Sequence, residues 1–268
     1  STVGGETTTW CGTGWTGQPV VWERPDGITE VIFGAYDKAV HFLDAATGEE
    51  SRPSFLTGDI IKGSVTLDPD GFPLLYTGSR DNKLRAIALD RDRPTELWAL
   101  DANVVNGIWN NVSIENSPAV YEQRVYFANS GGRVVGLDVS RIEDGDAPIV
   151  FDYWVGDDVD ATIVIDSEGM LYVAVEDERK TDRATELGQL IKLDPYTDDD
   201  PYVWGVPDPG GGGDGGFWAT PALGDGMIYI SSHTGRLLGV DAETGDVVWE
   251  ESISSHSWSS PVIVDETL

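Results

Sequence analysis

The feature that most constrains the fold of this chain is an internal repeat. Five hydrophobic stretches end in a small or aliphatic residue followed by Asp, and these aspartates recur at intervals of about 46 to 56 residues. They are Asp44, Asp90, Asp138, Asp194 and Asp241. A sequence period of this order indicates a repeat architecture, in which each repeat is one supersecondary unit packed on its neighbours. The chain is therefore expected to consist of five similar units.

Each repeat has the pattern of four short antiparallel strands. Residues 221–236 show it most clearly, as a strand, an Asp-Gly turn, a second strand and a second turn. β-Branched and aromatic residues alternate and Gly punctuates the turns, whereas helical periodicity is nearly absent. A short helix is expected only within residues 176–188, an insertion in the fourth repeat. The predicted repeats are 17–58, 63–105, 116–156, 160–206 and 218–252, with a partial copy at 258–268.

This pattern predicts an all-β protein, namely a β-propeller of four-stranded antiparallel blades in a single domain over residues 1–268. A tryptophan recurs at the end of the fourth strand in the second to fifth repeats. These residues are Trp98, Trp154, Trp204 and Trp249. A large apolar ring repeated at one position of each blade is expected to pack between blades rather than to bind a ligand.

The fifth repeat carries a recognisable motif. It begins at Pro221, continues with two hydrophobic strands joined by a turn, and ends with Asp241, Thr244-Gly245 and Trp249. At these residues the chain resembles the PQQ-like β-propeller repeat family, which includes quinoprotein dehydrogenases and scaffolds of the bacterial outer-membrane barrel-assembly machinery. The resemblance covers roughly residues 15–268. It implies a ring of seven or eight blades, so that five full repeats and a partial one are expected to be a fragment of such a ring.

Composition narrows the classes of partner. The chain has 47 acidic and 17 basic residues and a formal net charge of −30, which disfavours binding to nucleic acid. No apolar run approaches the length of roughly 18 residues that a membrane-spanning helix needs, so membrane insertion is not expected. A single cysteine, Cys11, rules out an intrachain disulfide. Residues 1–16 lack a signal-peptide pattern, and the resemblance implies a periplasmic or secreted bacterial protein.

No complete catalytic or metal-binding motif is present. The family's alcohol dehydrogenases carry adjacent cysteines, calcium-liganding carboxylates and a catalytic Asp, and this set does not map onto the chain. The acidic runs Asp157-Asp158-Val159-Asp160 and Asp198-Asp199-Asp200 have the density of a Ca²⁺ site but no complete loop motif, so they are interpreted as solvated turns. We therefore predict no catalytic residue, no metal site and no cofactor, with PQQ and calcium reserved for an enzymatic alternative.

Strand direction sorts the loops of a propeller into two faces. The connections between blades and the turns between second and third strands emerge on one face, and the remaining turns, such as Asp70-Gly71, emerge on the other. The first face collects aromatic rings and basic groups, which are common at binding surfaces. Its candidate residues are Trp15, Arg80, Trp109, Trp218, His233, His256 and Trp258.

These observations favour a non-catalytic binding or scaffolding propeller that presents this face to a protein, peptide or glycan. Two alternatives stay open. One is a degenerate quinoprotein oxidoreductase that holds PQQ and calcium, and the other is the sensor ectodomain of a larger receptor. A carboxylate and amide cluster beside an aromatic platform would favour the oxidoreductase.

Overall fold

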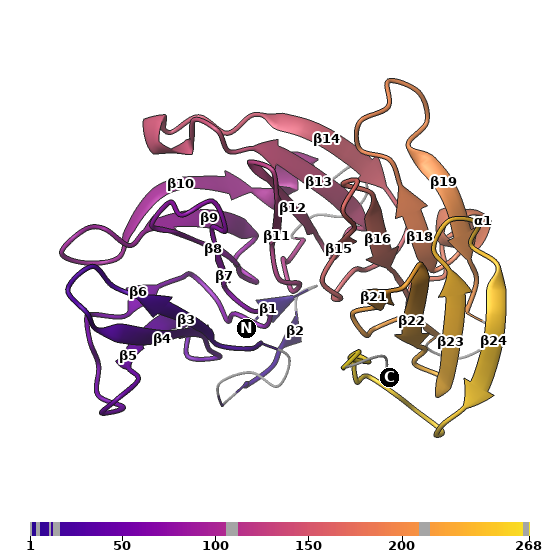
Figure 1. Cartoon of the computed structure of the whole chain (residues 1–268), viewed down its shortest axis with the longest axis horizontal. Helices are drawn as coiled ribbons and strands as arrows, with labels where there is room; N and C mark the ends of the chain where they lie inside the picture. Colours follow the sequence, from indigo (N-terminus) through magenta and orange to yellow (C-terminus); the bar gives the residue numbers. More distant parts are fainter. Residues whose placement is uncertain are drawn as a thin grey trace. The chain divides into compact units, whose positions relative to one another are not determined.

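The computed structural model describes residues 2–3, 6–10, 12, 17–105, 112–208, 215–264 and 268 of this chain. Within these residues the strands form five four-stranded antiparallel sheets and two two-stranded pairs (Figure 1). The described part contains one α-helix, α1 (Asp182–Leu187), and two 3₁₀ helices, η1 (Ala102–Val105) and η2 (Ile142–Asp144). No helix within it is long and apolar enough to cross a membrane. The predicted all-β fold of four-stranded sheets is confirmed.

Every four-stranded sheet lies within one sequence repeat, and its strands are hydrogen-bonded in chain order. The first two sheets are β3 (Val20–Glu23), β4 (Thr29–Gly34), β5 (Ala39–Asp44) and β6 (Phe55–Leu56), then β7 (Thr66–Leu67), β8 (Leu74–Gly78), β9 (Lys83–Ala88) and β10 (Thr95–Asp101). The third is β11 (Ala119–Tyr121), β12 (Arg124–Ala128), β13 (Arg133–Asp138) and β14 (Ile149–Trp154).

The fourth sheet is β15 (Val164–Ile165), β16 (Leu171–Ala174), β18 (Leu190–Leu193) and β19 (Tyr202–Val206). The fifth is β21 (Ala222–Gly224), β22 (Met227–Ser231), β23 (Arg236–Asp241) and β24 (Val247–Ser252). The insertion in the fourth repeat contains α1, as the sequence predicts, and β17 (Glu176–Asp177), which pairs with β20 (Gly215–Gly216). Near the N-terminus β1 (Thr2–Val3) pairs with β2 (Glu6–Thr7).

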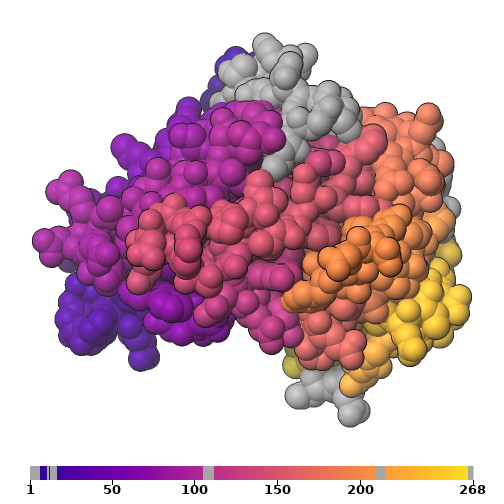
Figure 2. Space-filling model, turned by 90° about the horizontal axis from the view of Figure 1, so that it is seen from above, coloured from indigo at the N-terminus to yellow at the C-terminus, as the bar shows by residue number. Residues whose placement is uncertain are grey.

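The chain forms two compact units. The first consists of Ser1–Phe127 and Gly136–Val150, and the second of Ala128–Val135 and Phe151–Leu268. In the first unit the first and second sheets share a core that includes Ile32, Phe42 and Leu75. In the second unit the fourth sheet, red to orange, and the fifth sheet, orange to yellow, lie side by side and share a core (Figures 1 and 2).

The recurring tryptophans occupy one structural position. Trp98, Trp204 and Trp249 each lie on the fourth strand, at or next to a local shift in the pairing register with the third strand. Trp204 is 8% exposed and belongs to the same buried cluster as Ile228 and other residues of the fourth and fifth sheets. A Cβ atom added to Gly245 would lie 2.7 Å from the Trp204 ring, so this ring packs directly against the next repeat.

The repeated aspartates are turn residues. The carboxylates of Asp44, Asp138, Asp194 and Asp241 each accept a hydrogen bond from the backbone N–H two residues further along, at 2.7 to 2.9 Å. This Asx turn mimics a backbone turn and directs the chain from the third strand towards the fourth. The motif that reveals the repeat is therefore structural.

The hairpins between first and second strands follow the predicted Gly-containing turns. Gly71, Gly169 and Gly226 have φ values of 83°, 83° and 75°, a region that favours Gly. In two hairpins a buried tyrosine of the second strand donates to the turn aspartate at 2.9 Å: Tyr76 to Asp68 and Tyr172 to Asp166. Burial and these carboxylates raise the pKa of both phenols.

The last residues differ from the expected opening strand of a sixth repeat. Residues 258–263 form no strand, and Val264 makes only an isolated bridge. In each full repeat the first strand is held by pairing with the second, and no second strand follows among the described residues after Trp258. The blade number of the complete ring stays a prediction.

Candidate functional site

Three loops of the second unit bring together four of the residues predicted to face a partner. Trp218 lies in the connection from β19 to β21, and His233 lies in the turn between β22 and β23. His256 and Trp258 follow β24. We call these four residues the aromatic loop cluster. In this unit, inter-sheet connections and a turn between second and third strands meet, as strand direction predicts.

Three rings of the cluster are nearly parallel. The centroid of His233 lies 4.4 Å from that of Trp218, with 15° between the planes. Trp258 lies 5.8 Å from His233 and 6.0 Å from Trp218, at 11° and 15°. His256 meets His233 edge-on, with 5.3 Å between centroids. Contacts of this kind add about 0.5 to 1.5 kcal/mol per pair beyond the burial of apolar area, so they hold the rings in a defined arrangement.

Backbone hydrogen bonds hold the loops that carry these rings. The indole N–H of Trp218 donates to the carbonyl oxygen of Gly215 at 3.1 Å. The backbone N–H of His233 donates to the carbonyl of Gly216 at 2.9 Å, and Ser257 N–H donates to the carbonyl of His233 at 3.3 Å. The β20 glycines and the segment after β24 are thus both joined to the His233 turn.

The solvent exposure of the side chains increases from the inner to the outer residues of the aromatic loop cluster. His233 is 7% exposed and Trp218 is half-buried, whereas Trp258 is 51% exposed. His256 is also exposed. A large aromatic side chain that is fixed by stacking and yet half open to solvent is suited to bind another molecule, because little conformational entropy remains to be lost.

Carboxylates lie beside the cluster. Gly216 N–H donates to Asp208 Oδ2 at 2.9 Å, and Thr234 Oγ1 donates to Asp208 Oδ1 at 3.3 Å. Asp177 pairs with Gly215 across the β17–β20 ladder. Burial, together with the negative charges of Asp157 and Asp208, raises the pKa of Asp177. Negatively charged carboxylates therefore lie close to the loops that carry the aromatic rings.

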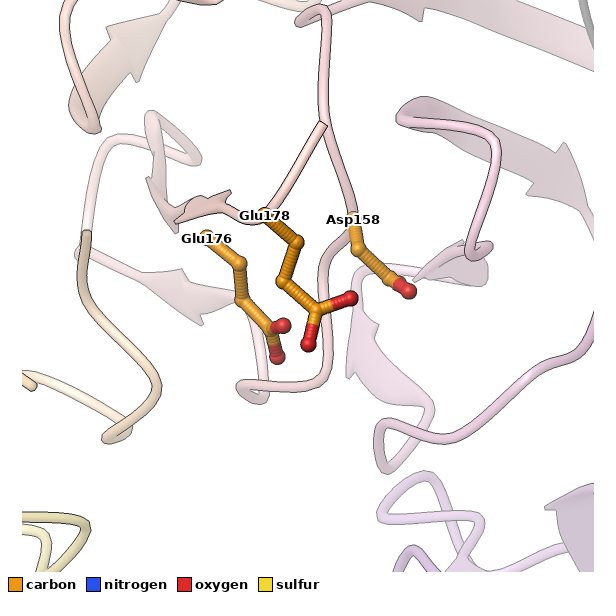
Figure 3. Close-up of side chains that lie close together, drawn as sticks. All are labelled: Asp158, Glu176 and Glu178. Atoms are coloured by element: carbon orange, nitrogen blue, oxygen red, sulfur yellow. The ribbon is translucent and has the colours of Figure 1, made fainter. Parts of the chain in front are cut away.

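A second group of acids combines two residues of the insertion, Glu176 and Glu178, with Asp158 from another loop. One carboxylate oxygen from each of Asp158, Glu176 and Glu178 falls within 4.8 Å of the others, and Figure 3 shows Glu178 reaching towards the other two side chains. Asp158 is 9% exposed and Glu176 is 2% exposed. The Nη1 atom of Arg179 lies 3.6 Å from a carboxylate oxygen of Asp158.

The interpretation of the run from Asp157 to Asp160 as a solvated turn is wrong. Asp157 is fully buried, and its Oδ2 accepts the backbone N–H groups of Arg179 and Lys180 at 2.8 and 2.9 Å. Asp157 and Asp158 can be buried here because the insertion supplies donors that replace water. The run Asp198-Asp199-Asp200 is exposed, as expected.

The donor set suits a hard cation but not a quinone. Carboxylate oxygens are the ligands that Ca²⁺ prefers, and Asp158, Glu176 and Glu178 are the residues that would hold it. PQQ is a planar polycarboxylate that needs an accessible ring face and cationic neighbours. Here His233 stacks on Trp218 at 4.4 Å, and the nearby charged groups are carboxylates. Around Trp218 and His233 the structure therefore places carboxylates where PQQ would need cationic neighbours.

The other predicted site residues do not join this cluster. Arg80 belongs to the first unit, where its Nε lies 3.0 Å from Glu115 and its guanidinium lies 5.7 Å from the Trp10 ring centroid. Lys62 also pairs with Glu115. Although burial opposes ionisation, the charges of Lys62 and Arg80 lower the pKa of Glu115. Trp15 and Trp109 lie outside the described residues.

Sequence reasoning missed the acidic group around Glu176 and Glu178. The signal was present, since the insertion in the fourth repeat interrupts the repeat pattern with a Glu-Asp-Glu run. What the sequence did not reveal is that β17 turns this run towards Asp158, on a different loop.

Four-stranded sheets repeated along the chain, with Trp204 packed between the fourth and fifth of them, define a protein of the β-propeller class. Residues 186–268 match the family model described as outer membrane protein assembly factor BamB, which confirms the resemblance to PQQ-like propellers. A comparison with curated proteins finds no match to this chain.

Solved structures show the same fold. BamB from Moraxella catarrhalis is 19% identical, with a TM-score of 0.61, and the match covers 86% of this chain and 60% of that one. Quinohemoprotein alcohol dehydrogenase from Comamonas testosteroni is 18% identical, with a TM-score of 0.68 and coverage of 89% and 43%. The computationally designed Ika8 protein is 12% identical, with a TM-score of 0.64 and coverage of 93% and 65%. The chain thus spans less than two thirds of each of these structures.

Proposed function

We propose that this chain is a non-catalytic binding module that uses the aromatic loop cluster to engage a peptide segment of a protein partner outside the cytoplasm. One observation carries the proposal: Trp258, which is 51% exposed, is held nearly parallel to Trp218 and to the buried His233. A side chain fixed in place before binding is a common source of affinity at interfaces.

Tryptophan is enriched among the residues that contribute most to protein–protein binding. Such residues act best when their surroundings exclude water and when the partner meets a complementary charge. The cluster satisfies both conditions through its stacked neighbours and the carboxylates of Asp177 and Asp208. The expected partner segment therefore combines an apolar or aromatic anchor with Lys or Arg.

The similarity of residues 186–268 to an outer membrane protein assembly factor supports a protein partner and a location outside the cytoplasm. This region contains the whole fifth repeat and the three loops of the proposed site. A glycan partner is less well supported, because the carboxylates beside the rings match the cationic groups of a peptide.

Selection from a displayed peptide library on the purified chain tests the proposal. We expect enriched peptides to contain basic and aromatic residues and to lose at least about tenfold in affinity for Trp258→Ala. The matched control is Phe72→Ala, which removes an aromatic side chain that is 44% exposed on the hairpin between β7 and β8. Equal binding by Trp258→Ala and the unmodified chain contradicts the proposed site, and saturable binding to glycans but not to peptides contradicts the proposed partner.

A further inference from the structure

A second aromatic site lies in the first unit and is independent of the aromatic loop cluster. A hollow of about 470 Å³ is lined by the side chains of Trp10, Phe33, Tyr36, Asp37 and His41, together with Gly12 and Ala35. Four of these residues carry aromatic rings, and one carries a carboxylate. None of them is among the seven residues predicted to bind a partner, although Tyr36 and Asp37 lie in a turn between second and third strands, the kind of turn assigned to that face.

The rings come from two segments of the chain. Trp10 precedes the first sheet, whereas Phe33 on β4, Tyr36 in the following turn and His41 on β5 belong to one hairpin. Trp10 meets Tyr36 edge-on, with 5.6 Å between centroids and 76° between planes. Phe33 stacks on His41 at 5.3 Å and 29°. The walls of the hollow therefore run in different directions, as they do in a cage.

Hydrogen bonds fix the polar side of this cage. His41 Nε2 lies 2.9 Å from Asp37 Oδ2, and His41 Nδ1 lies 3.1 Å from Ser54 Oγ. The backbone N–H of Tyr36 donates to the carbonyl of Gly12 at 3.1 Å, which ties the segment carrying Trp10 to the hairpin. The side chain of Asp37 is 59% exposed, so its negative charge is available at the rim.

Two cationic side chains of the first unit, Arg80 and Lys38, are paired with carboxylates. Arg80, whose guanidinium lies 5.7 Å from the Trp10 centroid, has its Nε 3.0 Å from the Glu115 carboxylate. Lys38 lies 3.6 Å from Asp59. Arg80 also shows that the Trp10 ring already attracts one cation. The carboxylate of Asp37 therefore gives the hollow a negative electrostatic potential. The net charge of −30 of the chain also attracts cations at long range.

We propose that this hollow binds a small quaternary ammonium compound. Aromatic faces attract such a cation through their quadrupoles, and its methyl groups gain apolar contact without needing hydrogen-bond acceptors. A primary ammonium or a metal ion would need oxygen ligands to replace its water shell, and the lining supplies rings rather than several oxygens. Asp37 adds a long-range attraction at the rim.

Titration of the full chain with choline chloride at constant ionic strength, followed by calorimetry and by broadening of the choline methyl proton signal, tests this site. We expect saturable binding that is at least about tenfold tighter than binding of 3,3-dimethylbutan-1-ol, the neutral compound of the same shape. Equal binding of the two compounds overturns the proposal, because it means that charge is not recognised. The absence of saturable choline binding overturns it as well.

Substitutions of residues that line the hollow test whether choline binds there. Asp37→Asn changes an exposed side chain and is expected to fold normally while weakening choline binding about threefold or more. Trp10→Ala and Phe33→Leu are expected to weaken it about tenfold, and Phe72→Ala serves as the control that leaves it unchanged. Unchanged affinity in Asp37→Asn and Phe33→Leu overturns the assignment, whether or not Trp10→Ala folds.

Discussion

The imidazole of His233 lies 4.4 Å from the Trp218 ring and is 7% exposed, so it forms the inner support of the aromatic loop cluster. Trp258 stacks on this pair from the solvent side. The inner rings are thereby expected to stabilise the loops, and the outer ring is expected to contribute to binding. Stability and binding measurements should separate these two roles.

Trp218→Ala is expected to lower the free energy of unfolding by about 2 kcal/mol, because it removes a half-buried ring and its contact with His233. Trp258→Ala is expected to cost less than about 1 kcal/mol, since half of its side chain is already in water. Urea unfolding followed by circular dichroism measures both values. A cost for Trp258→Ala as large as that for Trp218→Ala would mean that Trp258 only packs between loops.

The repeat and its sheets could be predicted from the sequence because their signals are local. The Asx turn at Asp241, the Gly turn at Gly226 and the strands between them are each determined by residues close together in the sequence. The position of Trp204 between the fourth and fifth sheets also follows from periodicity, because every repeat needs an apolar residue where it meets the next.

The candidate sites could be predicted only in part. Trp218, His233 and Trp258 were assigned to one face from strand direction, but their stacking depends on the ladder between β17 and β20, which joins an insertion to a loop about 40 residues away. The burial of Asp157 has the same origin, since its donors come from Arg179 and Lys180. Contacts made by one insertion leave no periodic signal.

Two glycine substitutions should distinguish backbone strain from packing. Gly226 and Gly245 have nearly the same φ, 75° and 78°, but a Cβ on Gly226 meets nothing within 4 Å, whereas one on Gly245 lies 2.7 Å from Trp204. Gly226→Ala is expected to cost about 1 kcal/mol from the positive φ alone. Gly245→Ala is expected to cost about 2 kcal/mol more, because the buried indole must move. Equal losses of unfolding free energy would show that Trp204 does not pack tightly against the next repeat.

The buried ion pair of the first unit should make stability depend on pH. Glu30 is fully buried, and Arg52 Nε donates to its Oε1 at 2.9 Å. Burial alone would raise the pKa of Glu30, but hydrogen bonds from Arg52 and Ser51 hold it below its ordinary value. The stabilisation is therefore complete above the ordinary Glu pKa of about 4.3 and is lost as the pH falls through the lower folded-state pKa.

Glu30→Gln is expected to lower the free energy of unfolding at neutral pH by about 3 kcal/mol, because Arg52 loses its charged partner while it stays buried. It should also flatten the dependence of stability on pH below about 4.3. Urea unfolding across this pH range measures both effects. Asp26→Asn, at the exposed partner of Arg24, is the control, and an equal response of the two variants would argue against a special role for the buried pair.

The proposed non-catalytic function predicts no quinone-dependent turnover. Incubation with PQQ and Ca²⁺, followed by a dye-linked assay on alcohols and sugars, is expected to give no rate above that of a heat-denatured sample. The physical reason is that carboxylates flank the stacked rings and that His233 covers a face of Trp218. Dye reduction that scales with protein concentration would refute the proposed function and favour the oxidoreductase alternative.

The net charge of −30 is expected to make stability depend on salt. Like charges repel across the compact state, and unfolding relieves this repulsion by separating them. Dissolved salt screens charges beyond a Debye length of about 10 Å at 0.1 M, so long-range repulsion weakens while close pairs such as Arg52 with Glu30 change little. The melting temperature should therefore rise between low-salt buffer and molar NaCl, as measured by circular dichroism. The same rise with NaCl and KCl would identify screening as the cause, whereas a melting temperature that does not change with salt would show that the surface acids repel one another too weakly to matter.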